Sequence, residues 1–542
     1  MRFSDNHDER RAIARFGEPA ALAASVLVFT LDGVPMIYNG MEVGDTTESG
    51  APALFEKLPI FWPIAERRPE FRRFYKQLME WRRETKALRR GTLEWVKNSD
   101  ESRVVSFVRR AGNEEVLVAI NFSSVPFSGT VGSTPIRLDP WQYSINLQGG
   151  AYADAHWLTA AKNGFGTSAT LESKVWFTLA NGVMSEVFYP TVDLPNVQLL
   201  QLVVQTDRNV ETEFSDTQHR LELPSPGSLT FQQVNTARHG QYKITKTYVT
   251  DPQRHTVLID LQFESRMPVG VAVVYDPSLN NSGKYDVGST VGDALVAEEG
   301  NIASALVSNC GLDKQSNVNN GNLTQFVMLK HLDATQSVKL NCTIALGFGE
   351  NVASAANAAR ASLAKGFAAI RSEYEAGWRQ YVSGLPRVET QHQQQFNMAA
   401  MVLRGLEDKT FRGAVIASPS SPWGGGPNAN EPTVSGYHAV WSRDLYHVAT
   451  AFIALGDMPT ANRLFDYLFR VQQKPDGSFP RNTWVDGRPT SDGGGVQLDQ
   501  VALPLVLAYQ LKRTDRQTWQ KHLKPAADLI VRRGPKTDQD RW

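Results

Sequence analysis

The sequence predicts a multidomain protein of mixed α and β structure, and three observations lead to this prediction. The chain has 542 residues, the length of three or four domains at about 150 residues each. A central stretch, from about residue 146 to residue 349, alternates apolar and polar side chains with the period of β-strands. The residues after it repeat apolar side chains with the period of α-helices, and the first 145 residues combine both patterns.

Composition and charge exclude several classes of protein. Apolar residues make up 42% of the chain and charged residues 21%, which excludes a largely disordered protein. Lys plus Arg and Asp plus Glu both number 56, so no charge excess favours a nucleic-acid or membrane partner. The two cysteines, Cys310 and Cys342, allow one disulfide and no cysteine-based zinc site. We therefore expect no cofactor, while calcium binding and oligomeric state are not readable from the sequence.

The start of the chain carries no targeting signal. It reads MRFSDNHDERR, which lacks the apolar core of a signal peptide. The longest nearly apolar run, 19–31, is too short to span a bilayer. The compartment stays open: cytoplasmic as written, or secreted if a leader precedes the chain.

The first 145 residues predict a βα-barrel segment followed by a small β domain. An apolar run over 33–40 predicts a strand. A helix is indicated by four large side chains at helical spacing: Phe71, Phe74, Tyr75 and Leu78. A strand, a polar loop and a helix in succession are typical of βα-barrels, which carry functional groups after their strands. The segments 103–108 and 116–120, joined by a turn at 112–113, predict a β-hairpin.

The middle of the chain predicts a large β-sandwich. In one segment, apolar residues alternate with Thr256, Asp260 and Gln262, and the segment 338–346 shows the same alternation. Cys342 falls on the inward face of that second segment, so we expect a buried, small apolar side chain there.

The last part of the chain predicts helices. Three apolar stripes at helical spacing indicate them: Leu445, Val448 and Phe452; Ala461, Leu464, Phe465, Leu468 and Val471; Trp519, Leu523, Ala526 and Ile530. Between the stripes lie long loops rich in Gly, Pro and aromatic residues, and such loops on a helical scaffold usually carry function.

A first candidate motif lies at the N-terminus. The segment FSDNHDERR precedes the run GVPMIYNGMEVG, the helix RRPEFRRFYKQLMEWRRETKALRRG and the strands VLVAINFSS and LDPWQYSI. Together these segments resemble the last part of the α-amylase family, over residues 2–145. The resemblance implies that Asp8 is a carboxylate that stabilises the transition state and that His7 holds sugar hydroxyls beside it. The two carboxylates that carry the chemistry in that family come from strands before this segment.

A second candidate motif is YHAVWSRDLY, at 437–446. Read by itself, it is a helix start with Ser442 as N-cap and Asp444 in the first turn. Read as a site, its guanidinium, carboxylate and aromatic faces suit a sugar ring, which offers hydroxyl edges and an apolar face.

The chain also contains the loops PSSPWGGG and DGSFPRNTWVDGRPTSDGGGVQLDQ and the upstream stretch NGFGTSATLESKVWFTLANGVMSEVFYPTVDLPNVQLLQLVV. Together with the motif at 437–446, they resemble the glucoamylase/glucodextranase family, over residues 147–542. The resemblance implies a β-sandwich before an (α/α)6 barrel and the inverting release of β-glucose from the non-reducing ends of α-glucans or maltooligosaccharides. By motif match, the residues around the terminal glucose are Tyr437, Trp441, Arg443, Asp444 and Trp484.

We therefore expect five segments: an α-amylase-type barrel remnant over 1–90, a small β domain over 91–145, a β-sandwich over 146–353, a helical linker over 354–390 and part of an (α/α)6 barrel over 391–542. The expected function is that of a glycoside hydrolase of glucoamylase type. In that family a Glu directly after a Trp, in a segment like GPKTDQDRW at 534–542, is the general acid. The 542 residues end at that Trp, so we expect no turnover by this polypeptide; the alternatives are a non-catalytic α-glucan-binding protein and a gene fragment.

Overall fold

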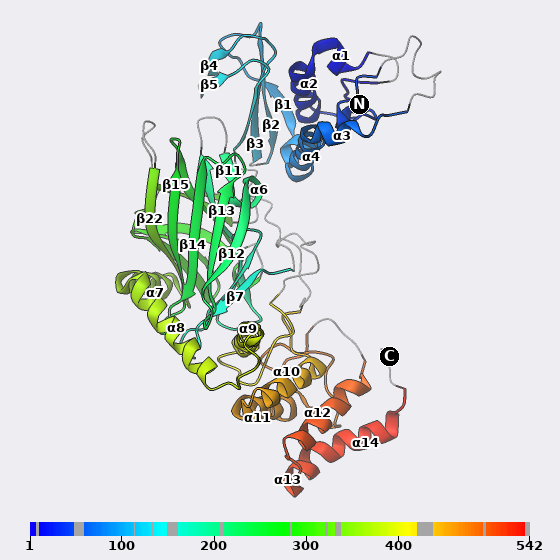
Figure 1. Cartoon of the computed structure of the whole chain (residues 1–542), viewed down its shortest axis with the longest axis vertical. Coiled ribbons are helices and arrows are strands. Elements are labelled where there is room, and N and C mark those ends of the chain that lie inside the picture. Colours follow the sequence, from blue (N-terminus) through cyan, green and yellow to red (C-terminus); the bar gives the residue numbers. More distant parts are fainter. Residues whose placement is uncertain are drawn as a thin grey trace. The chain divides into compact units, whose positions relative to one another are not determined.

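The chain folds into two compact units, Met1–Asp154 and Ala155–Trp542 (Figure 1). The computed structural model describes residues 1–6, 10–47, 59–112, 114–132, 134–148, 161–205, 210–281, 285–319, 323–330, 338–419, 437–490 and 495–536. The finer division into five segments stays a prediction.

The N-terminal unit combines helices with an antiparallel sheet. Its helices are α1 (Ala12–Phe16), α2 (Glu18–Thr30), α3 (Ile64–Arg67), α4 (Pro69–Glu84) and α5 (Lys86–Arg90). A four-stranded sheet has the order β1 (Thr92–Trp95), β2 (Val104–Ala111), β3 (Glu114–Asn121), β6 (Tyr143–Gln148), and β4 (Phe127–Val131) pairs with β5 (Thr134–Leu138). The buried Arg109 of β2 donates to the carbonyls of Thr30 (2.7 Å) and Gly91 (2.9 Å), which ties the helices to the sheet.

Two predictions for this unit are confirmed and one is wrong. The helix predicted from its apolar face is α4, which buries Phe71, Tyr75 and Leu78, and the predicted hairpin is β2–β3. The predicted strand over 33–40 is instead an isolated parallel bridge between Arg2 and Pro35. An apolar run becomes a strand only when neighbouring strands accept and donate its backbone hydrogen bonds, and the described residues supply a single bridge there.

The second unit begins with two eight-stranded antiparallel sheets (Figure 1). One sheet contains β7 (Gly164–Thr167), β8 (Trp176–Ala180), β9 (Val183–Phe188), β10 (Pro195–Gln205), β11 (Val210–Thr212), β16 (Gly270–Pro277), β20 (Asp313–Asn319) and β21 (Leu323–Lys330). The other contains β12 (Thr217–Ser225), β13 (Thr230–Ala237), β14 (Tyr242–Thr250), β15 (Thr256–Ser265), β17 (Val287–Val291), β18 (Ala294–Glu299), β19 (Ile302–Ser308) and β22 (Val338–Gly349). Apolar residues of both sheets belong to one continuous core. The β structure predicted for the middle of the chain is confirmed, as two large antiparallel sheets.

The predicted alternation holds only where one face of a strand meets water. Asp260 and Gln262 of β15 lie outside the core as predicted, but Thr256 is buried. In β22, Cys342 is buried, as predicted, and it forms no disulfide, yet Thr343 and Ala345 on the opposite face are buried as well.

Helix α7 (Val352–Lys365) explains the burial of both faces of β22. It packs on β22 so closely that a Cβ on Gly347 would lie 2.6 Å from the carbonyl oxygen of Ala355. The following helix, α8 (Phe367–Ser383), lies against β14 and β15. Residues 354–390, which the sequence predicted as a helical linker, therefore contain helices that cover the β region.

The last part of the chain is helical, as predicted. Its helices are α9 (Gln393–Gly405), α10 (Ser442–Ala454), α11 (Met458–Tyr467), α12 (Leu498–Gln510), α13 (Arg516–Thr518) and α14 (Lys524–Arg533). Helix α10 contacts α11 and α12, and α12 contacts α14. The predicted stripes lie mostly inside, but Val471 and Trp519 are exposed. That these helices form part of an (α/α)6 barrel stays a prediction.

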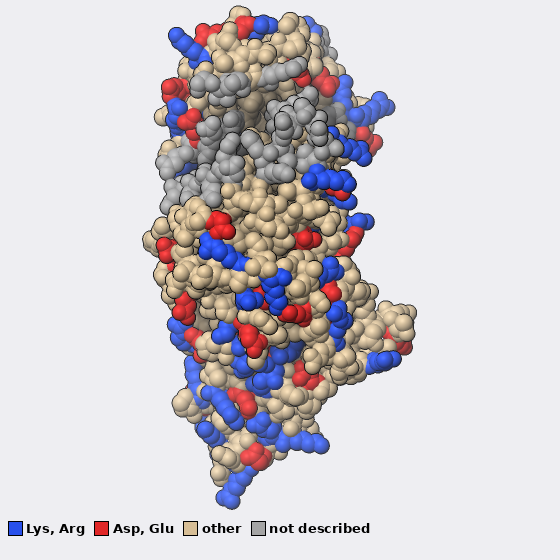
Figure 2. Space-filling model, turned by 90° about the vertical axis from the view of Figure 1, so that its left-hand side faces the viewer, with Lys and Arg blue, Asp and Glu red and all other residues tan. Residues whose placement is uncertain are grey.

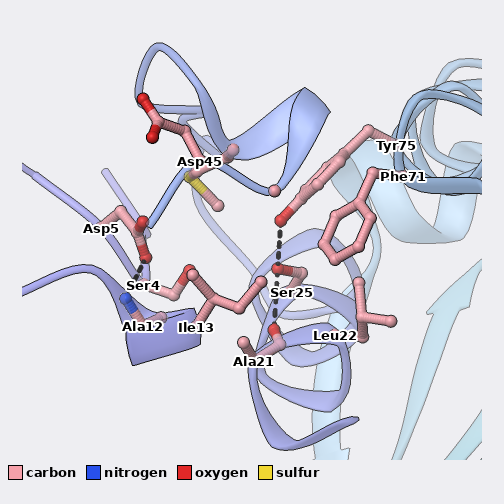
Figure 3. A pocket seen from close by; sticks show the side chains of 12 residues that line it. Ser4, Asp5, Ala12, Ile13, Ala21, Leu22, Ser25, Asp45, Phe71 and Tyr75 are labelled. Carbon is pink, nitrogen blue, oxygen red and sulfur yellow. Dashed lines mark hydrogen bonds between the residues drawn. The ribbon is translucent and has the colours of Figure 1, made fainter. Parts of the chain in front are cut away.

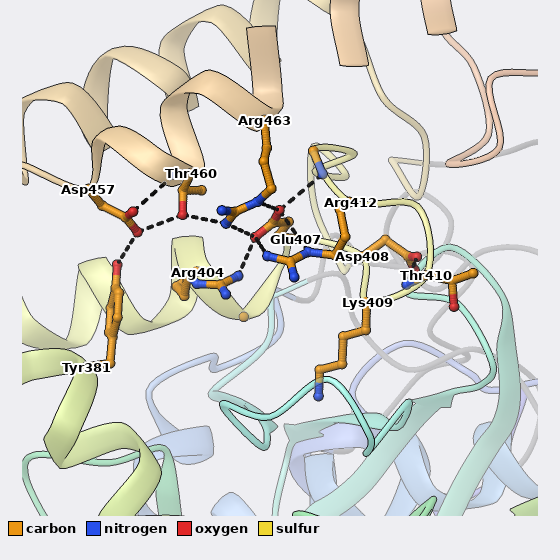
Figure 4. Close-up of polar contacts among 12 residues, drawn as sticks. Tyr381, Arg404, Glu407, Asp408, Lys409, Thr410, Arg412, Asp457, Thr460 and Arg463 are labelled. Atoms are coloured by element: carbon orange, nitrogen blue, oxygen red, sulfur yellow. Dashed lines mark hydrogen bonds and ion pairs between the residues drawn. The ribbon is translucent and has the colours of Figure 1, made fainter. Parts of the chain in front are cut away.

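A buried carboxylate joins α9 to α11 (Figure 4). The side chain of Glu407 is fully buried and contacts three guanidinium groups, those of Arg404, Arg412 (3.0 Å) and Arg463 (2.8 Å). Burial by itself raises the pKa of Glu407, but the hydrogen bonds and charges of the three arginines outweigh it and lower the pKa to about 2. One carboxylate therefore compensates three cations at this junction.

The neighbouring Lys409 joins the same segment to the β region. Its buried ammonium group donates to Thr167 Oγ1 at 2.7 Å and to the Ser168 carbonyl at 2.9 Å, and it lies 5.0 Å from the centre of the Trp176 ring. The segment after α9 is thus anchored to the β region by the buried hydrogen bonds of one lysine.

On the face drawn in Figure 2, Lys and Arg side chains are interspersed with Asp and Glu. Among the described helices, none is long and apolar enough to cross a membrane.

Candidate functional site

Of the predicted N-terminal site, His7 and Asp8 lie outside the described residues. The residues on either side of them line a small cavity, which Figure 3 shows from close by. At its edge, the buried Asp5 accepts a hydrogen bond from the Ala12 backbone N–H at 3.0 Å. Ser25 and Tyr75 hydroxyls lie 2.9 Å apart in the same cavity. Burial raises the pKa of Asp5, and the charge of Arg11, 3.8 Å away, opposes that shift.

The second predicted site is assembled from two loops that meet in a short antiparallel bridge. Val440 and Thr483 exchange backbone hydrogen bonds of 2.8 and 3.0 Å. The buried Gln472 donates both to the Val440 carbonyl (2.9 Å) and to Thr483 Oγ1 (2.8 Å), and so holds the two loops together. Trp441 and Trp484 each follow a bridged residue directly, so this bridge brings together two segments that the sequence analysis selected separately.

Aromatic rings occupy the first loop. The rings of Tyr437 and Trp441 have centroids 5.9 Å apart and are tilted by 45°. Both side chains are partly exposed, whereas His438 between them is buried with its ring edge-on to Phe188 of β9, at 5.2 Å. The buried histidine ring fixes the loop to the sheet, with a partly exposed aromatic side chain before and after it.

Trp484 is held from two directions. Its backbone N–H donates to the Arg488 carbonyl at 2.8 Å, and its carbonyl accepts from the hydroxyl of Tyr467, on α11, at 3.0 Å. The next residue, Val485, donates its N–H to the buried carboxylate of Asp193 at 3.0 Å. Burial raises the pKa of Asp193 to about 6. A loop of the β region thus supports the segment that carries Trp484.

Helix α10 begins directly after Trp441 and presents the charged residues of the motif. Asp444 lies in its first turn, as predicted. The prediction of Ser442 as N-cap is wrong: Trp441 occupies the N-cap position, and no side chain caps the helix there. The Ser442 hydroxyl instead donates to Gln500 of α12, at 2.9 Å to its carbonyl and 3.0 Å to its side-chain oxygen. The Ser442 hydroxyl, which the local sequence predicted as a helix cap, therefore joins α10 to α12.

Arg443 contacts two residues at the start of α12. Its Nη1 lies 3.0 Å from Asp499 Oδ2, and its Nη2 donates to Gln497 Oε1 at 2.9 Å. Desolvation raises the pKa of Asp444; the charge of Arg443 opposes the shift and that of Asp499 adds to it. Gln497 and Asp499 were not selected in the sequence analysis, although both lie in the VQLDQ end of the loop that resembles the family. The signal that could have identified them is a group of polar residues directly at a helix start.

Comparisons with known proteins bear on this site. Residues 148–383 match the family described as glucodextranase, domain N, and residues 392–542 match glycosyl hydrolases family 15. Residues 148–542 are thus glucodextranase- and glucoamylase-like. A glucoamylase of Clostridium sp. (strain G0005) is 36% identical over 434 residues, which are 75% of this chain and 61% of that protein. The resemblance to the glucoamylase/glucodextranase family is confirmed.

The structure comparison agrees. A bacterial glucoamylase solved in complex with acarbose superposes with a TM-score of 0.66 at 34% identity, over 72% of this chain and 61% of that one. This chain therefore spans about three fifths of the length of both glucoamylases. The α-amylase resemblance has weaker support: alpha-amylase 2 of Dictyoglomus thermophilum is 30% identical over 166 residues, which are 27% of this chain.

The described residues contain no cluster of side chains suited to binding a metal ion. Among those residues, His, Cys, Asp and Glu side chains form no group of three or more that could hold an ion. The second site presents a guanidinium, a carboxylate and two aromatic rings.

Proposed function

We propose that this chain binds the non-reducing end of an α-glucan or maltooligosaccharide and that it takes part in inverting hydrolysis of the glucoamylase type. The observation that carries the proposal is the cluster at the start of α10. There the tilted rings of Tyr437 and Trp441 precede the guanidinium of Arg443 in a chain segment whose family match is glycosyl hydrolases family 15. The residues proposed to surround the terminal glucose are Tyr437, Trp441, Arg443, Asp444 and Trp484.

The chemistry of these groups supports a sugar ligand. A pyranose presents C–H groups on its faces, which pack against aromatic rings, and hydroxyls on its edge, which accept from a guanidinium and donate to a carboxylate. Asp444 is exposed at the start of α10, so its carboxylate can accept a hydrogen bond from a ligand hydroxyl. Inversion itself requires an acid and a base carboxylate about 6.5–9.5 Å apart, and the five residues proposed here bind the sugar and are not assigned to that pair.

The N-terminal unit is a separate proposal. Its resemblance to the end of an α-amylase assigns His7 and Asp8 to sugar contact and transition-state stabilisation. Because both lie outside the described residues, no geometry supports this assignment beyond the neighbouring cavity of Asp5.

Replacing Arg443 with alanine is expected to weaken acarbose binding about a hundredfold, because a charged hydrogen bond contributes about 1.5–3 kcal/mol. Isothermal titration calorimetry on the full chain measures the dissociation constant. The matched control is Arg470→Ala, on an arginine whose side chain is 65% exposed and paired with Asp466.

Equal affinities of the Arg443 and Arg470 variants would refute the site assignment. A glucose-release assay on maltotriose distinguishes a hydrolase from a protein that only binds α-glucans. Release of β-glucose identifies inverting hydrolysis, and binding without release identifies an α-glucan-binding module.

A further inference from the structure

Arg443 is held by a neighbouring helix rather than by its own. Gln497, the N-cap residue of α12, is only 3% exposed, and its Oε1 accepts from Arg443 Nη1 at 3.2 Å and from Nη2 at 2.9 Å. Asp499, in the first turn of α12, lies 3.0 Å from Nη1. Both contacts engage the terminal nitrogens of the guanidinium from the same helix start.

The start of α12 is itself fixed against α10. Gln500 donates through Nε2 to Gln497 Oε1, and it accepts from the Ser442 hydroxyl at both its carbonyl and its side-chain oxygen. Ser442, Gln497 and Gln500 are all buried. These bonds fix the spacing between the two helix starts, and with it the position of the Gln497 oxygen relative to the backbone of Arg443.

We propose that Gln497 and Asp499 are positioning residues, which hold the guanidinium of Arg443 in place for a ligand before the ligand arrives. This inference rests on the proposed function, in which Arg443 contacts the terminal glucose. An arginine side chain has several rotatable bonds, and ordering it on binding costs free energy that a preorganised side chain does not lose again. A guanidinium has five N–H donors, and the contacts with Gln497 and Asp499 involve only Nη1 and Nη2.

The charges around Arg443 agree with this arrangement. Asp499 compensates the guanidinium, so Asp444 on α10 is not consumed in a local ion pair with its neighbour. The Gln497 oxygen adds an uncharged acceptor in a buried position, where a hydrogen bond to a cation is strong. Arg443 and Asp444 can therefore offer a donor and an acceptor from the same helix start.

The experiment compares Gln497→Met, Asp499→Asn and the rescue variant Gln497→Glu in the full chain. Methionine keeps the length of the side chain and removes its acceptor, whereas glutamate keeps an acceptor oxygen. The matched control is Gln510→Met, at the exposed C-terminal end of the same helix. Acarbose affinity is measured by calorimetry. The order of the guanidinium without ligand is measured from the Nε–Hε resonance of Arg443 in arginine-labelled protein, assigned with Arg443→Lys.

We expect Gln497→Met to weaken acarbose binding ten- to hundredfold and to broaden the Arg443 resonance. Gln497→Glu should restore both, Asp499→Asn should have a smaller effect of the same sign, and Gln510→Met should change neither. A sharp, unshifted resonance in Gln497→Met overturns the positioning role. So does a loss of affinity that Gln497→Glu fails to restore. If the wild-type chain does not bind acarbose, the proposed function fails, and the resonance alone decides whether Gln497 positions Arg443.

Discussion

Replacing Glu407 with glutamine is expected to lower the free energy of unfolding of the unit 155–542 by about 3–5 kcal/mol. Three guanidinium groups converge on this buried carboxylate, and the neutral variant removes the one negative charge that all three contact (Figure 4). Calorimetry on the full chain measures the shift of the transition. Hydrogen exchange should localise the loss of protection to α9 and α11, which the cluster joins.

In the wild-type protein, protonation of Glu407 at low pH should destabilise the same unit. The pKa of Glu407 is lowered from 4.5 to about 2 in the folded state, so its contribution is complete above about 4.5 and is lost as the pH falls towards 2. The matched control is Glu389→Gln, on an exposed carboxylate near the start of α9. A Glu407→Gln variant as stable as this control at pH 7 would contradict the compensating role of the cluster.

Replacing Asp193 with asparagine is expected to stabilise the unit 155–542 at pH 8, by on the order of 3 kcal/mol. Burial raises the pKa of this carboxyl from 3.8 to about 6, because the folded protein disfavours its ionised form. The folded state therefore binds the proton more tightly than the unfolded state. The stability that this group contributes is complete at low pH and is lost as the pH rises through about 6.

The asparagine keeps an oxygen that can accept from the Val485 N–H, so the support of the Trp484 segment should survive. Thermal unfolding of wild type and variant should nearly agree at pH 4, diverge between about pH 4 and pH 6, and differ by a constant amount above that. Asp286, whose pKa burial raises to about 7, titrates in both proteins and cancels in the difference. The control is Asp293→Asn, on a carboxylate that is 68% exposed. If the difference in unfolding free energy between wild type and Asp193→Asn stays the same from about pH 4 to pH 8, folding does not raise the pKa of Asp193.

Much of the candidate site could be predicted from the sequence because its residues are close neighbours along the chain. Tyr437, Trp441, Arg443 and Asp444 lie within one loop and one helix start, where local pattern and family resemblance both apply. Trp484 was selected from a second segment by the same means. The contact between these two segments through the Val440–Thr483 bridge was not predictable, because α10, α11 and the π-helical turn Leu468–Gln472 separate them along the chain and they meet only after folding.

The sequence by itself determined the order of secondary structure along the chain. It indicated an amphipathic helix and a hairpin near the start, strands of period two in the middle, and helices with apolar stripes after them. These follow from local periodicity, which each segment carries alone. Tertiary structure decided the rest. The apolar run at 33–40 pairs only through a single bridge, Ser442 bonds to α12 instead of capping α10, and Asp193 reaches Val485 from 292 residues away. A buried donor or acceptor must find a partner wherever the fold supplies one, and the identity of that partner depends on which distant segments the packed core brings into reach.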